Sequence, residues 1–254
     1  MSAHRLHLYY APKTGHLTHS YCLCLFRQGL SYGHNGTVLY ETTGLYGKSK
    51  VRRIDPGTFG VNKSIDVDGH YFGEGSTYYT DEDGNGRLIE ITWKEQTGFI
   101  YDCDTFEKLK EFKYTTDHGH GDQGWGITYD EANKEFIVSD GTQYLFIWDR
   151  DTLEEKRKVA VTRFDGSEQK NLNELEFIDG LCCCNIWYDD HIICVDPVTG
   201  KSVREYDMSS LWPTNERGGA DVLNGIALGK DHVLLTGKLW DRMYKIQFPD
   251  WALF

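Results

Sequence analysis

A period of 47 residues constrains this chain more than any other feature of its sequence. Four apolar runs end in an aspartate, and neighbouring aspartates lie 47 residues apart at every step: Asp55, Asp102, Asp149 and Asp196. One further step reaches Met243, beside the similar run Tyr244–Phe248, which lacks the aspartate. Internal repeats of this length are typical of propellers, solenoids and related arrays.

Each aspartate opens a turn that has a threonine three positions later, as in Asp102-Cys-Asp-Thr105. A carboxylate at the first position of a turn can accept N–H bonds from residues two or three positions on. An alternating run follows each turn, and two more runs precede each aspartate, for example residues 126–129 and 135–139. One unit is therefore four short strands in 47 residues, which is the size of a β-propeller blade.

Five such units account for nearly all of the 254 residues. We therefore predict an all-β fold, a five-bladed β-propeller of four-stranded antiparallel blades, as one domain over residues 1–254. The fifth unit runs out of sequence after its third strand, whereas Arg5–Tyr10 has a strand pattern and no partner of its own. We expect this N-terminal strand to close the last blade, which removes an open sheet edge. An eight-stranded sandwich is the alternative, but a sandwich does not require a fixed period.

Charge and cysteine content limit the partners and the compartment. The formal net charge of −12 argues against nucleic acid and anionic membrane surfaces. No segment approaches the roughly 20 apolar residues of a membrane helix, and Met1–Pro12 has no secretory pattern. The seven cysteines form no Cys-x-x-Cys pair. We interpret them as reduced, strand-embedded apolar residues, which favours a reducing compartment. The compartment itself stays open, because the chain is either intracellular or has had a leader removed.

Equivalent positions of a propeller meet around one axis, so two sets of residues should surround one mouth of the central channel. The inner strands begin at Gln28, Glu74, Trp125, Asn173 and Asn224. A glycine follows four of these residues and lets neighbouring backbones converge. The second strands end near Trp93, Trp187 and Lys238. One carboxylate, one amine, amides and three indoles would then form a small polar pocket with aromatic walls.

At these residues the chain resembles the plant and bacterial type of glutaminyl-peptide cyclotransferase, a family of five-bladed propellers. The matching stretches run in family order from about residue 26 to residue 248, and they include Tyr71–Gly75, Gly124–Thr128, Leu172–Glu176, Val222–Ala227 and Thr236–Trp240. Single pieces such as Thr-Gly-Lys carry no weight, but nine or ten pieces in order are highly specific.

The resemblance implies conversion of an N-terminal glutamine of a peptide or protein into pyroglutamate, with release of ammonia. It makes Glu74 the acid–base residue. It also implies a substrate pocket formed by Phe26, Gln28, Phe72, Trp93, Trp125, Asn173, Trp187 and Lys238. The chain departs from the family pattern at Ser20–Cys22, where Pro-His-Asp is usual, and at Gln123, where Glu is common. These departures concern loop shape and peptide preference more than the core chemistry.

Such a cyclisation requires a group that takes a proton from the attacking α-amine and returns it to the leaving nitrogen. A carboxylate among indoles, with a raised pKa, can do both, so Glu74 is the candidate. Alternatively, Glu74 is a carboxylate with only a structural role in the channel, and the indoles could be ordinary core residues. Lys238 or Asn173 could stabilise the developing oxyanion. Lys238 and Gln28 could instead hold the backbone carbonyl of the substrate.

Two polar loops could hold a metal ion. Asp81–Gly86 has the first half of a calcium loop, but Thr92 stands at the twelfth position, so we favour a solvated hairpin. Asp117–Asp122 contains two histidines and could bind a transition metal, although a polar inserted loop is the simpler interpretation. We expect that catalysis requires no cofactor. A structural calcium ion, which the resemblance to plant members suggests, stays open.

The rival hypothesis is a non-catalytic propeller that binds peptides or proteins, as WD-repeat rings do. It predicts a surface without a buried carboxylate and amine facing one another. A propeller hydrolase or lyase with a calcium site has less support. For the leading hypothesis, a transferase, we expect peptide or protein substrates with an N-terminal glutamine, no nucleic-acid or membrane partner, and a monomer.

Overall fold

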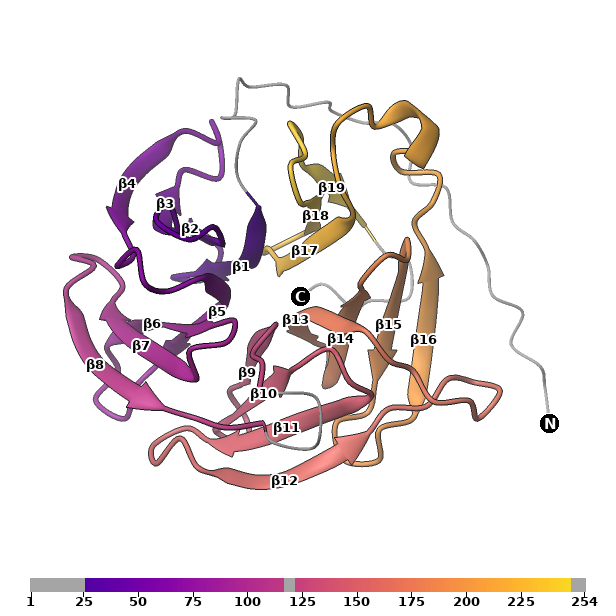
Figure 1. Cartoon of the computed structure of the whole chain (residues 1–254), viewed down its shortest axis with the longest axis horizontal. Helices are drawn as coiled ribbons and strands as arrows, with labels where there is room; N and C mark the ends of the chain where they lie inside the picture. Colours follow the sequence, from indigo (N-terminus) through magenta and orange to yellow (C-terminus); the bar gives the residue numbers. More distant parts are fainter. Residues whose placement is uncertain (1–25, 117–121, 248–254) are drawn as a thin grey trace.

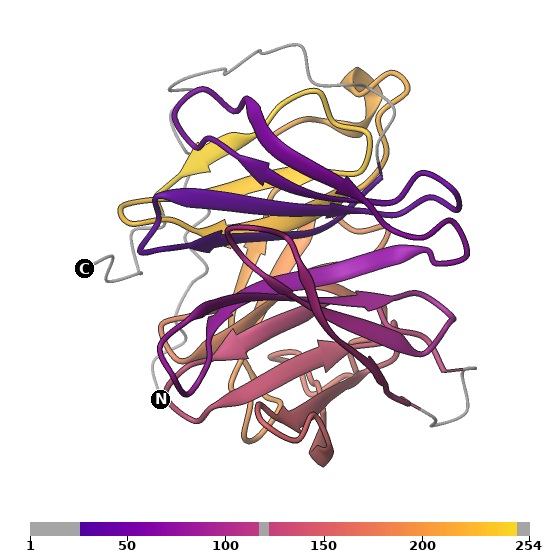
Figure 2. The same cartoon turned by 90° about the vertical axis from the view of Figure 1, so that its left-hand side faces the viewer.

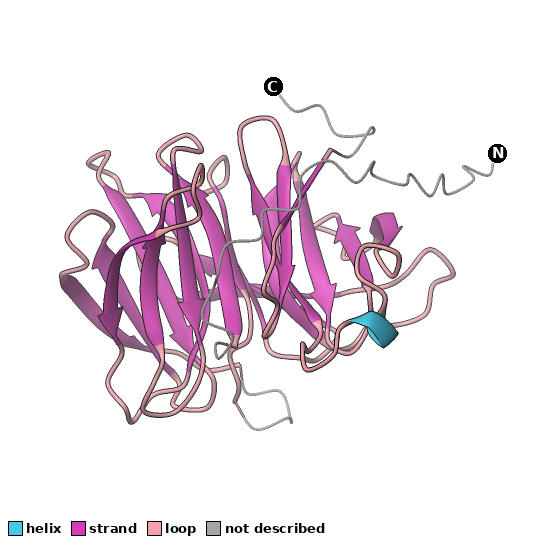
Figure 3. Ribbon diagram, turned by 90° about the horizontal axis from the view of Figure 1, so that it is seen from above, coloured by secondary structure: helices cyan, strands magenta, loops and turns pink. Residues whose placement is uncertain are grey.

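The computed structural model describes residues 26–116 and 122–247. Its strands form five antiparallel sheets that are arranged as blades around a central axis (Figure 1). In the side views, the strands cross the thickness of the ring and the loops gather at its two ends (Figures 2 and 3). The predicted five-bladed propeller is therefore confirmed, and the sandwich alternative is wrong.

Each blade is a meander in which consecutive strands pair from the axis outwards. Blade 1 contains β1 (Arg27–Gly33), β2 (Val38–Thr43), β3 (Lys50–Ile54) and β4 (Val61–Asp66). Blade 2 contains β5 (Gly73–Thr80), β6 (Gly86–Thr92), β7 (Thr97–Asp102) and β8 (Lys108–Lys113). Blade 3 contains β9 (Ile127–Asp130), β10 (Glu135–Ser139), β11 (Tyr144–Asp149) and β12 (Glu155–Ala160). Blade 4 contains β13 (Leu172–Ile178), β14 (Leu181–Ile186), β15 (His191–Val195) and β16 (Ser202–Asp207).

Blade 5 has three strands in the described part of the chain: β17 (Leu223–Leu228), β18 (Val233–Gly237) and β19 (Tyr244–Ile246). A short 3-10 turn, η1 (Thr214–Glu216), precedes it. The predicted closing strand, Arg5–Tyr10, lies outside the described residues, so closure of the last blade by this strand stays a prediction.

Blades 1 and 5 are nevertheless joined at the inner edge of the ring. The guanidinium of Arg27, at the start of β1, donates to the carbonyls of Gly237 and Trp240. The side-chain amide of Asn224 donates in return to the carbonyl of Arg27, at 3.0 Å. These bonds connect residues about 200 positions apart in the sequence. The first and last blades therefore share polar contacts that do not involve the N-terminal segment.

The turn aspartates act as the sequence predicts. In all four turns an aspartate Oδ1 accepts backbone N–H bonds of 2.7–3.2 Å from the residues two and three positions on; the four are Asp55, Asp102, Asp149 and Asp196. Because these bonds favour the ionised carboxylate, the pKa values of Asp55, Asp102 and Asp149 lie below the usual range. The 47-residue period is thus the repetition of one turn at the same corner of successive blades.

The apolar core lies between the blades rather than in one centre. Five buried clusters fill the five wedges between neighbouring sheets. The cluster that joins blade 5 to blade 1 includes Leu234 and Met243 on one side and Leu39 and Ile54 on the other. The middle strands are therefore covered on both faces and are strongly apolar, whereas an outer strand such as β8 is mostly exposed.

The interpretation of the cysteines as reduced is wrong for one pair. Cys183 and Cys194 form a disulfide between β14 and β15, where they are directly opposite one another. Cys103, Cys182 and Cys184 are free and buried, as expected for small apolar residues. The disulfide weakens the inference of a reducing compartment from cysteine usage. Cross-strand register brings the pair together, and neither the cysteine count nor the run of three cysteines reveals that register.

The described part of the chain is made of strands, loops and the single turn η1 (Figure 3). Within it, no helix is long and apolar enough to span a bilayer.

Candidate active site

Four of the five inner strands carry a β-bulge where the sequence predicts a site residue. The pairing register shifts between Arg27 and Gly29, Gly73 and Ser76, Leu172 and Leu175, and Leu223 and Ile226. The residues inside these bulges include Gln28, Glu74, Asn173 and Asn224. A bulge takes a residue out of the regular ladder and re-aims its side chain. The fold thus repeats one local distortion at the mouth of the channel and places a polar residue in each copy.

Glycines allow the inner strands to approach one another at these bulges. A Cβ atom on Gly29 would lie 2.3 Å from the backbone nitrogen of Ser76 in blade 2. A Cβ on Gly75 would lie 2.7 Å from the Cα of Gly126, and a Cβ on Gly126 would lie 2.1 Å from the carbonyl oxygen of Asn173. The inner strands of blades 1 to 4 therefore begin in backbone contact, which brings their first side chains together as predicted.

Glu74 is buried at this mouth, with 5% of its surface exposed. Its carbonyl accepts a hydrogen bond from the hydroxyl of Thr42, at 2.6 Å, while its carboxyl Oε2 has no hydrogen-bond partner among the described residues. Burial raises the pKa of Glu74 far above that of an ordinary glutamate; the positive charge of Lys238 opposes this rise and Glu95 adds to it. The carboxyl group is therefore partly protonated near neutral pH, and its Oε2 is open to a ligand.

Lys238 follows β18 in blade 5 and is also buried. Two backbone bonds of 2.9 Å fix its position, one from its N–H to the carbonyl of Val222 and one from the N–H of Asp221 to its carbonyl. Burial lowers the pKa of Lys238, and the negative charges of Glu74 and Asp221 oppose this effect. A buried acid from blade 2 and a buried amine from blade 5 therefore interact electrostatically across the mouth.

The three predicted indoles form a connected wall. Trp93 and Trp125 both donate their ring N–H to Oε1 of Gln123, at 2.8 and 3.0 Å. The rings of Trp125 and Trp187 meet edge to face, with centroids 5.3 Å apart. All three side chains are half-buried rather than fully enclosed. The structure thus brings them together at the surface of the channel mouth, in contrast to a core tryptophan such as Trp148, which is 1% exposed.

Phe72 extends this wall towards blade 1. Its ring contacts those of Trp93 and Tyr46, with centroid distances of 5.4 and 5.3 Å. Glu95 accepts hydrogen bonds from the Tyr46 hydroxyl at 2.8 Å and from the Phe72 N–H at 3.3 Å. Phe26 lies directly before β1, where its carbonyl accepts the N–H of Gly44 at 2.8 Å, so it is at the same end of the blade. Contact between Phe26 and a substrate stays a prediction.

Several buried amide and carboxyl atoms at the mouth have no hydrogen-bond partner among the described residues: Gln28 Oε1, Glu74 Oε2, Asn173 Nδ2 and Oδ1, Asn185 Nδ2, and Asn224 Oδ1. Asn185 and Asn224 each use their other polar atom within the protein, whereas Asn173 leaves both unused. Buried polar groups in proteins are normally hydrogen-bonded. A cluster of unused donors and acceptors is therefore suited to a small polar ligand that carries an amide.

Sequence reasoning did not assign a role to three residues of this site. Gln123 joins two indoles, Glu95 raises the pKa of Glu74, and Asp221 acts on Lys238. Gln123 and Glu95 each stand two positions from a predicted site residue, Trp125 and Trp93, whereas Asp221 stands three positions from Asn224. The contacts that give these three residues a role connect different strands and turns, so the sequence alone does not reveal them.

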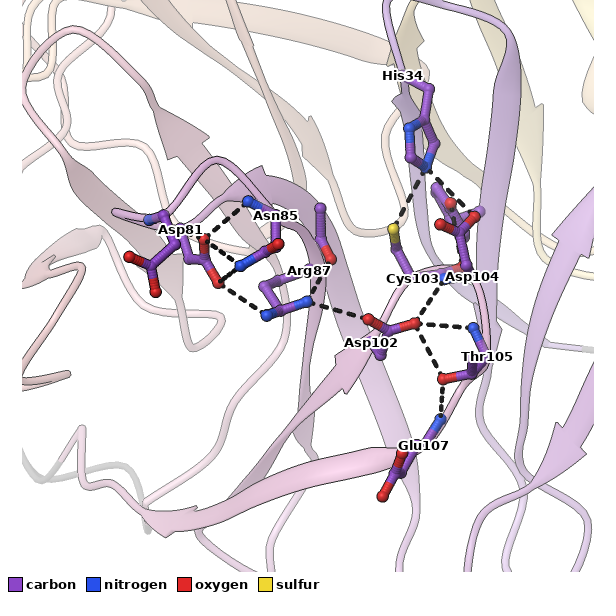
Figure 4. Close-up of polar contacts among 12 residues, drawn as sticks. His34, Asp81, Asn85, Arg87, Asp102, Cys103, Asp104, Thr105 and Glu107 are labelled. Carbon is purple, nitrogen blue, oxygen red and sulfur yellow. Dashed lines mark hydrogen bonds and ion pairs between the residues drawn. The ribbon is translucent and has the colours of Figure 1, made fainter.

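In the hairpin Asp81–Gly86, the carboxylate of Asp81 is bound by neighbouring groups of the protein. Oδ1 of Asp81 accepts the N–H of Asp83 at 3.1 Å and of Asn85 at 2.8 Å, and Oδ2 pairs with Arg87 at 2.9 Å (Figure 4). These contacts describe the hairpin, and the choice between a solvated hairpin and a calcium loop stays a prediction. The other polar loop, Asp117–Asp122, lies outside the described residues except for Asp122.

Comparisons with known proteins agree with this architecture. The family model described as glutamine cyclotransferase matches residues 15–248. A glutaminyl-peptide cyclotransferase of Arabidopsis thaliana is 39% identical over 231 residues, which cover 87% of this chain and 67% of that protein. The crystal structure of Myxococcus xanthus glutaminyl cyclase is similar with a TM-score of 0.75 and 27% identity, over 90% of this chain and 93% of that one. This chain therefore belongs to the glutamine cyclotransferase family.

Proposed function

We infer that this chain is a glutaminyl-peptide cyclotransferase, an aminoacyltransferase that converts the N-terminal glutamine of peptides or proteins to pyroglutamate and releases ammonia. Its family and its curated relative support this activity. The structural observation that carries it is the buried pair Glu74 and Lys238 at a mouth that contains unpartnered amide groups and half-buried indoles. The rival, a non-catalytic binding propeller, predicts no such pair, and no observation favours it.

In the reaction, the α-amine of the substrate attacks the carboxamide carbon of its own side chain. A new N–C bond closes the five-membered ring, and the bond to the amide nitrogen breaks. The attacking nitrogen loses one proton, and the leaving nitrogen gains one to depart as ammonia. An α-amino group has a pKa of about 7.7–8.0, so only a minor fraction of it, roughly a tenth to a sixth, is the free amine at pH 7. One carboxylate can take the proton from the amine and return it to the leaving group.

We assign this proton transfer to Glu74. An ordinary glutamate, with a pKa near 4.3, would be too weak a base to take the proton readily. Burial raises the pKa of Glu74 towards that of the amine, which makes transfer in both directions nearly balanced. Its unpartnered Oε2 supplies the atom for the transfer. Lys238 keeps part of the Glu74 population ionised, because its positive charge opposes the effect of burial.

Two groups are able to stabilise the oxyanion of the tetrahedral intermediate. Asn173 carries a buried Nδ2 donor without a partner among the described residues, and Lys238 carries a buried amine. A donor in a water-poor site stabilises developing charge more strongly than it would in water. Lys238 and Gln28 are alternatively placed to bind the backbone carbonyl of the substrate. In either arrangement Phe72, Trp93, Trp125 and Trp187 hold the glutamine side chain folded towards its own amine.

We propose that these side chains suffice for the chemistry and that catalysis requires no metal or cofactor. Every proton and charge in the reaction has a candidate group in the chain. We further propose that the enzyme acts as a monomer without nucleic-acid or membrane partners, and its net charge of −12 supports the last two points.

The activity is tested with a dipeptide that begins with glutamine, by coupled detection of ammonia. The decisive variant is Glu74→Gln, which keeps the size of the side chain and removes the base. We expect kcat to fall by roughly 10²–10⁴-fold, the usual contribution of general acid–base catalysis. The matched control is Glu90→Gln in β6 of the same blade, where a second fully buried carboxyl accepts a hydrogen bond from Tyr101 at 2.9 Å. This control should retain wild-type turnover.

The two possible failures are distinguishable. Wild-type turnover by folded Glu74→Gln protein would refute the role of Glu74 and leave the activity standing. Absence of ammonia release by folded wild-type protein, across a set of glutamine-initiated peptides, would refute the activity itself.

A further inference from the structure

Three potential metal ligands meet at the end of the propeller opposite the candidate active site (Figure 4). The candidate active site lies where inner strands begin and second strands end, as at the pair Arg27 and Thr43. His34 lies at the other end of β1, in the hairpin that leads to β2, while Cys103 and Asp104 lie in the turn after β7. Blade 1 therefore supplies one potential ligand, and blade 2 supplies two.

The geometry of this cluster fits a tetrahedral zinc ion. Nε2 of His34 is 3.2 Å from Sγ of Cys103 and 3.8 Å from Oδ1 of Asp104. All three ligand atoms lie within 4.8 Å of one another. With Zn–N, Zn–O and Zn–S bonds of about 2.0–2.3 Å, neighbouring ligand atoms of a tetrahedral site are roughly 3.3–3.6 Å apart. Only small side-chain adjustments would be needed to close the three groups around one ion.

Each potential ligand is held in place by the backbone around it. Asp102 accepts the N–H of Asp104 at 3.1 Å in the repeated turn, which fixes the two residues that follow β7. The hydroxyl of Tyr40 donates to the carbonyl of Cys103 at 3.2 Å. A Cβ on Gly86 would lie 2.5 Å from the sulfur of Cys103, so the glycine leaves room for the thiol.

His34 is equally fixed and is reachable from solvent. Its backbone is left-handed, with φ of 50°, and its ring lies against that of Tyr78 with centroids 5.2 Å apart. His34 and Asp104 have side-chain exposures of 32% and 64%, whereas Cys103 is 1% exposed. The cluster therefore combines a buried thiol with two accessible groups through which an ion can enter.

The propeller fold does not require this combination of residues. The position of Cys103 in the repeated turn is taken in the other blades by Pro56, Arg150 and Pro197. At the next junction between blades, Arg150 donates to the carbonyl of Thr80, at the end of β5. The same position thus faces the inner hairpin of the preceding blade, but a thiol and an imidazole meet only between blades 1 and 2 among the described residues. The pair is a property of this junction and not of the repeat.

Two cationic side chains contact Asp104. Arg53 lies 3.4 Å from Oδ1 of Asp104, and Lys63 donates to the carbonyl of Asp104. The contact with Arg53 is partly exposed, and a side-chain rotation of Asp104 can exchange it for a metal bond, whereas Lys63 contacts only the backbone of Asp104.

We propose that His34, Cys103 and Asp104 form a zinc-binding site that links blades 1 and 2, with its fourth position open to water. A nitrogen, a sulfur and an oxygen ligand suit zinc, whereas calcium and magnesium select oxygen ligands. The site is remote from Glu74, and it stabilises the junction between the two blades. It is independent of the cyclotransferase activity.

The test uses the full chain after removal of metal with a chelator. Cobalt(II) serves as the spectroscopic probe, because its bond to a thiolate gives a charge-transfer absorption in the near ultraviolet, and zinc affinity is measured by competition with a coloured chelator. We compare wild type with His34→Asn, since asparagine tolerates a positive φ, and with Cys103→Ser. His70→Asn, at an exposed histidine in the loop after blade 1, is the matched control.

We expect one equivalent of cobalt to produce the thiolate absorption in wild type and in the control. Both site variants should bind zinc roughly 100-fold more weakly or worse, since even the loss of an outer-shell partner costs about 10–100-fold. Zinc should raise the Tm of wild type and control but not of the two variants. Ammonia release should be equal in all four proteins.

Two results would overturn the proposal. Equal zinc affinity in wild type and both site variants would assign the ion elsewhere, for instance to histidines among residues 1–25 or 117–121. Absence of the thiolate absorption at stoichiometric cobalt would leave His34 and Cys103 as a simple hydrogen-bonded pair.

Discussion

The convergence of inner strands at the channel mouth makes Gly126→Ala a sharp test of how the site is built. Gly126 has no positive φ, so an alanine there is penalised only by its contacts. Its Cβ would lie 2.1 Å from the carbonyl oxygen of Asn173 and 3.0 Å from the Cα of Glu174. Ordinary contacts begin at 3.4 Å, so the start of β13 must retreat by about 1.3 Å. The contacting atoms are backbone atoms, which cannot rotate away as a flexible side chain can.

The magnitude follows from this displacement. Overpacking of a well-packed region costs about 1–3 kcal/mol. For a domain of this size 1 kcal/mol corresponds to about 2–4 °C, so Tm should fall by roughly 2–12 °C. The same shift moves Asn173 at the candidate active site and lengthens the 2.6 Å bond from the Ser139 hydroxyl to its carbonyl. A misplacement of about 1 Å can cost roughly 10²-fold in rate, so kcat/KM should fall by about that factor.

Two measurements check this prediction: thermal unfolding followed by circular dichroism, and ammonia release at a temperature well below the Tm of the variant. The control is Gly219→Ala, because a Cβ there meets no atom within 4 Å and its φ is not positive. The control should stay within about 0.5 kcal/mol of wild type. Wild-type Tm and kcat/KM for Gly126→Ala would show that the inner strands are not in the tight contact from which the site is derived.

Three further predictions concern single side chains. Glu174→Ala removes the acceptor of two buried backbone N–H groups, of Leu30 and Ile226, and should lower the urea-derived free energy of unfolding by about 1–3 kcal/mol for each. Gln123→Ala leaves two indole N–H groups without their acceptor and should raise KM by roughly tenfold with little change in kcat. Gln123→Glu keeps an acceptor and should restore KM. An unchanged KM in the alanine variant would contradict the positioning role of Gln123. Burial raises the pKa of Glu90 to about 8, against about 4.3 in the unfolded chain, so folding takes up a proton between these two pH values. The free energy of unfolding therefore falls as pH rises through this window, by up to about 1.4 kcal/mol per pH unit. Glu90→Gln should therefore flatten that fall in urea titrations from about pH 5 to pH 8, and an unchanged slope would show that Glu90 titrates normally.

The fold could be predicted because its determinants are local and repeated. The turn aspartates accept bonds from the next few residues, so the same turn is recognisable in each blade without knowledge of the rest of the chain. Strand alternation is equally local. Once the period is known, equivalent positions must surround one axis. This is why Glu74, Trp125 and Asn173 could be predicted to meet although about 50 residues separate each from the next along the chain.

Contacts that depend on strand register or on how neighbouring blades face one another could not be predicted in the same way. The disulfide depends on the register of β14 against β15, which places Cys194 and not its neighbours opposite Cys183. The pair of His34 and Cys103 depends on how the hairpin of one blade faces a turn of the next. In both cases a change of one position in register or loop would separate the residues, and the period contains no information about it.

Glu174 shows which property separates a catalytic from a structural carboxyl group in this ring. It occupies the position where the other four inner strands have glycine, and it lies in the same kind of bulge as Glu74. Both carboxyl groups are buried, and burial raises the pKa of each. Burial and a shifted pKa therefore do not distinguish them.

The difference lies in their hydrogen bonds. The two oxygens of Glu174 accept the N–H groups of Leu30 in blade 1 at 3.3 Å and of Ile226 in blade 5 at 2.8 Å. Its side chain thus spans three blades and fills the place where the other strands meet backbone to backbone. Glu74 leaves Oε2 without a partner among the described residues and interacts with the amine of Lys238 through space. A carboxyl group that is already saturated by backbone donors stabilises the ring, whereas one that keeps a free oxygen beside a buried cation is able to exchange a proton with a substrate.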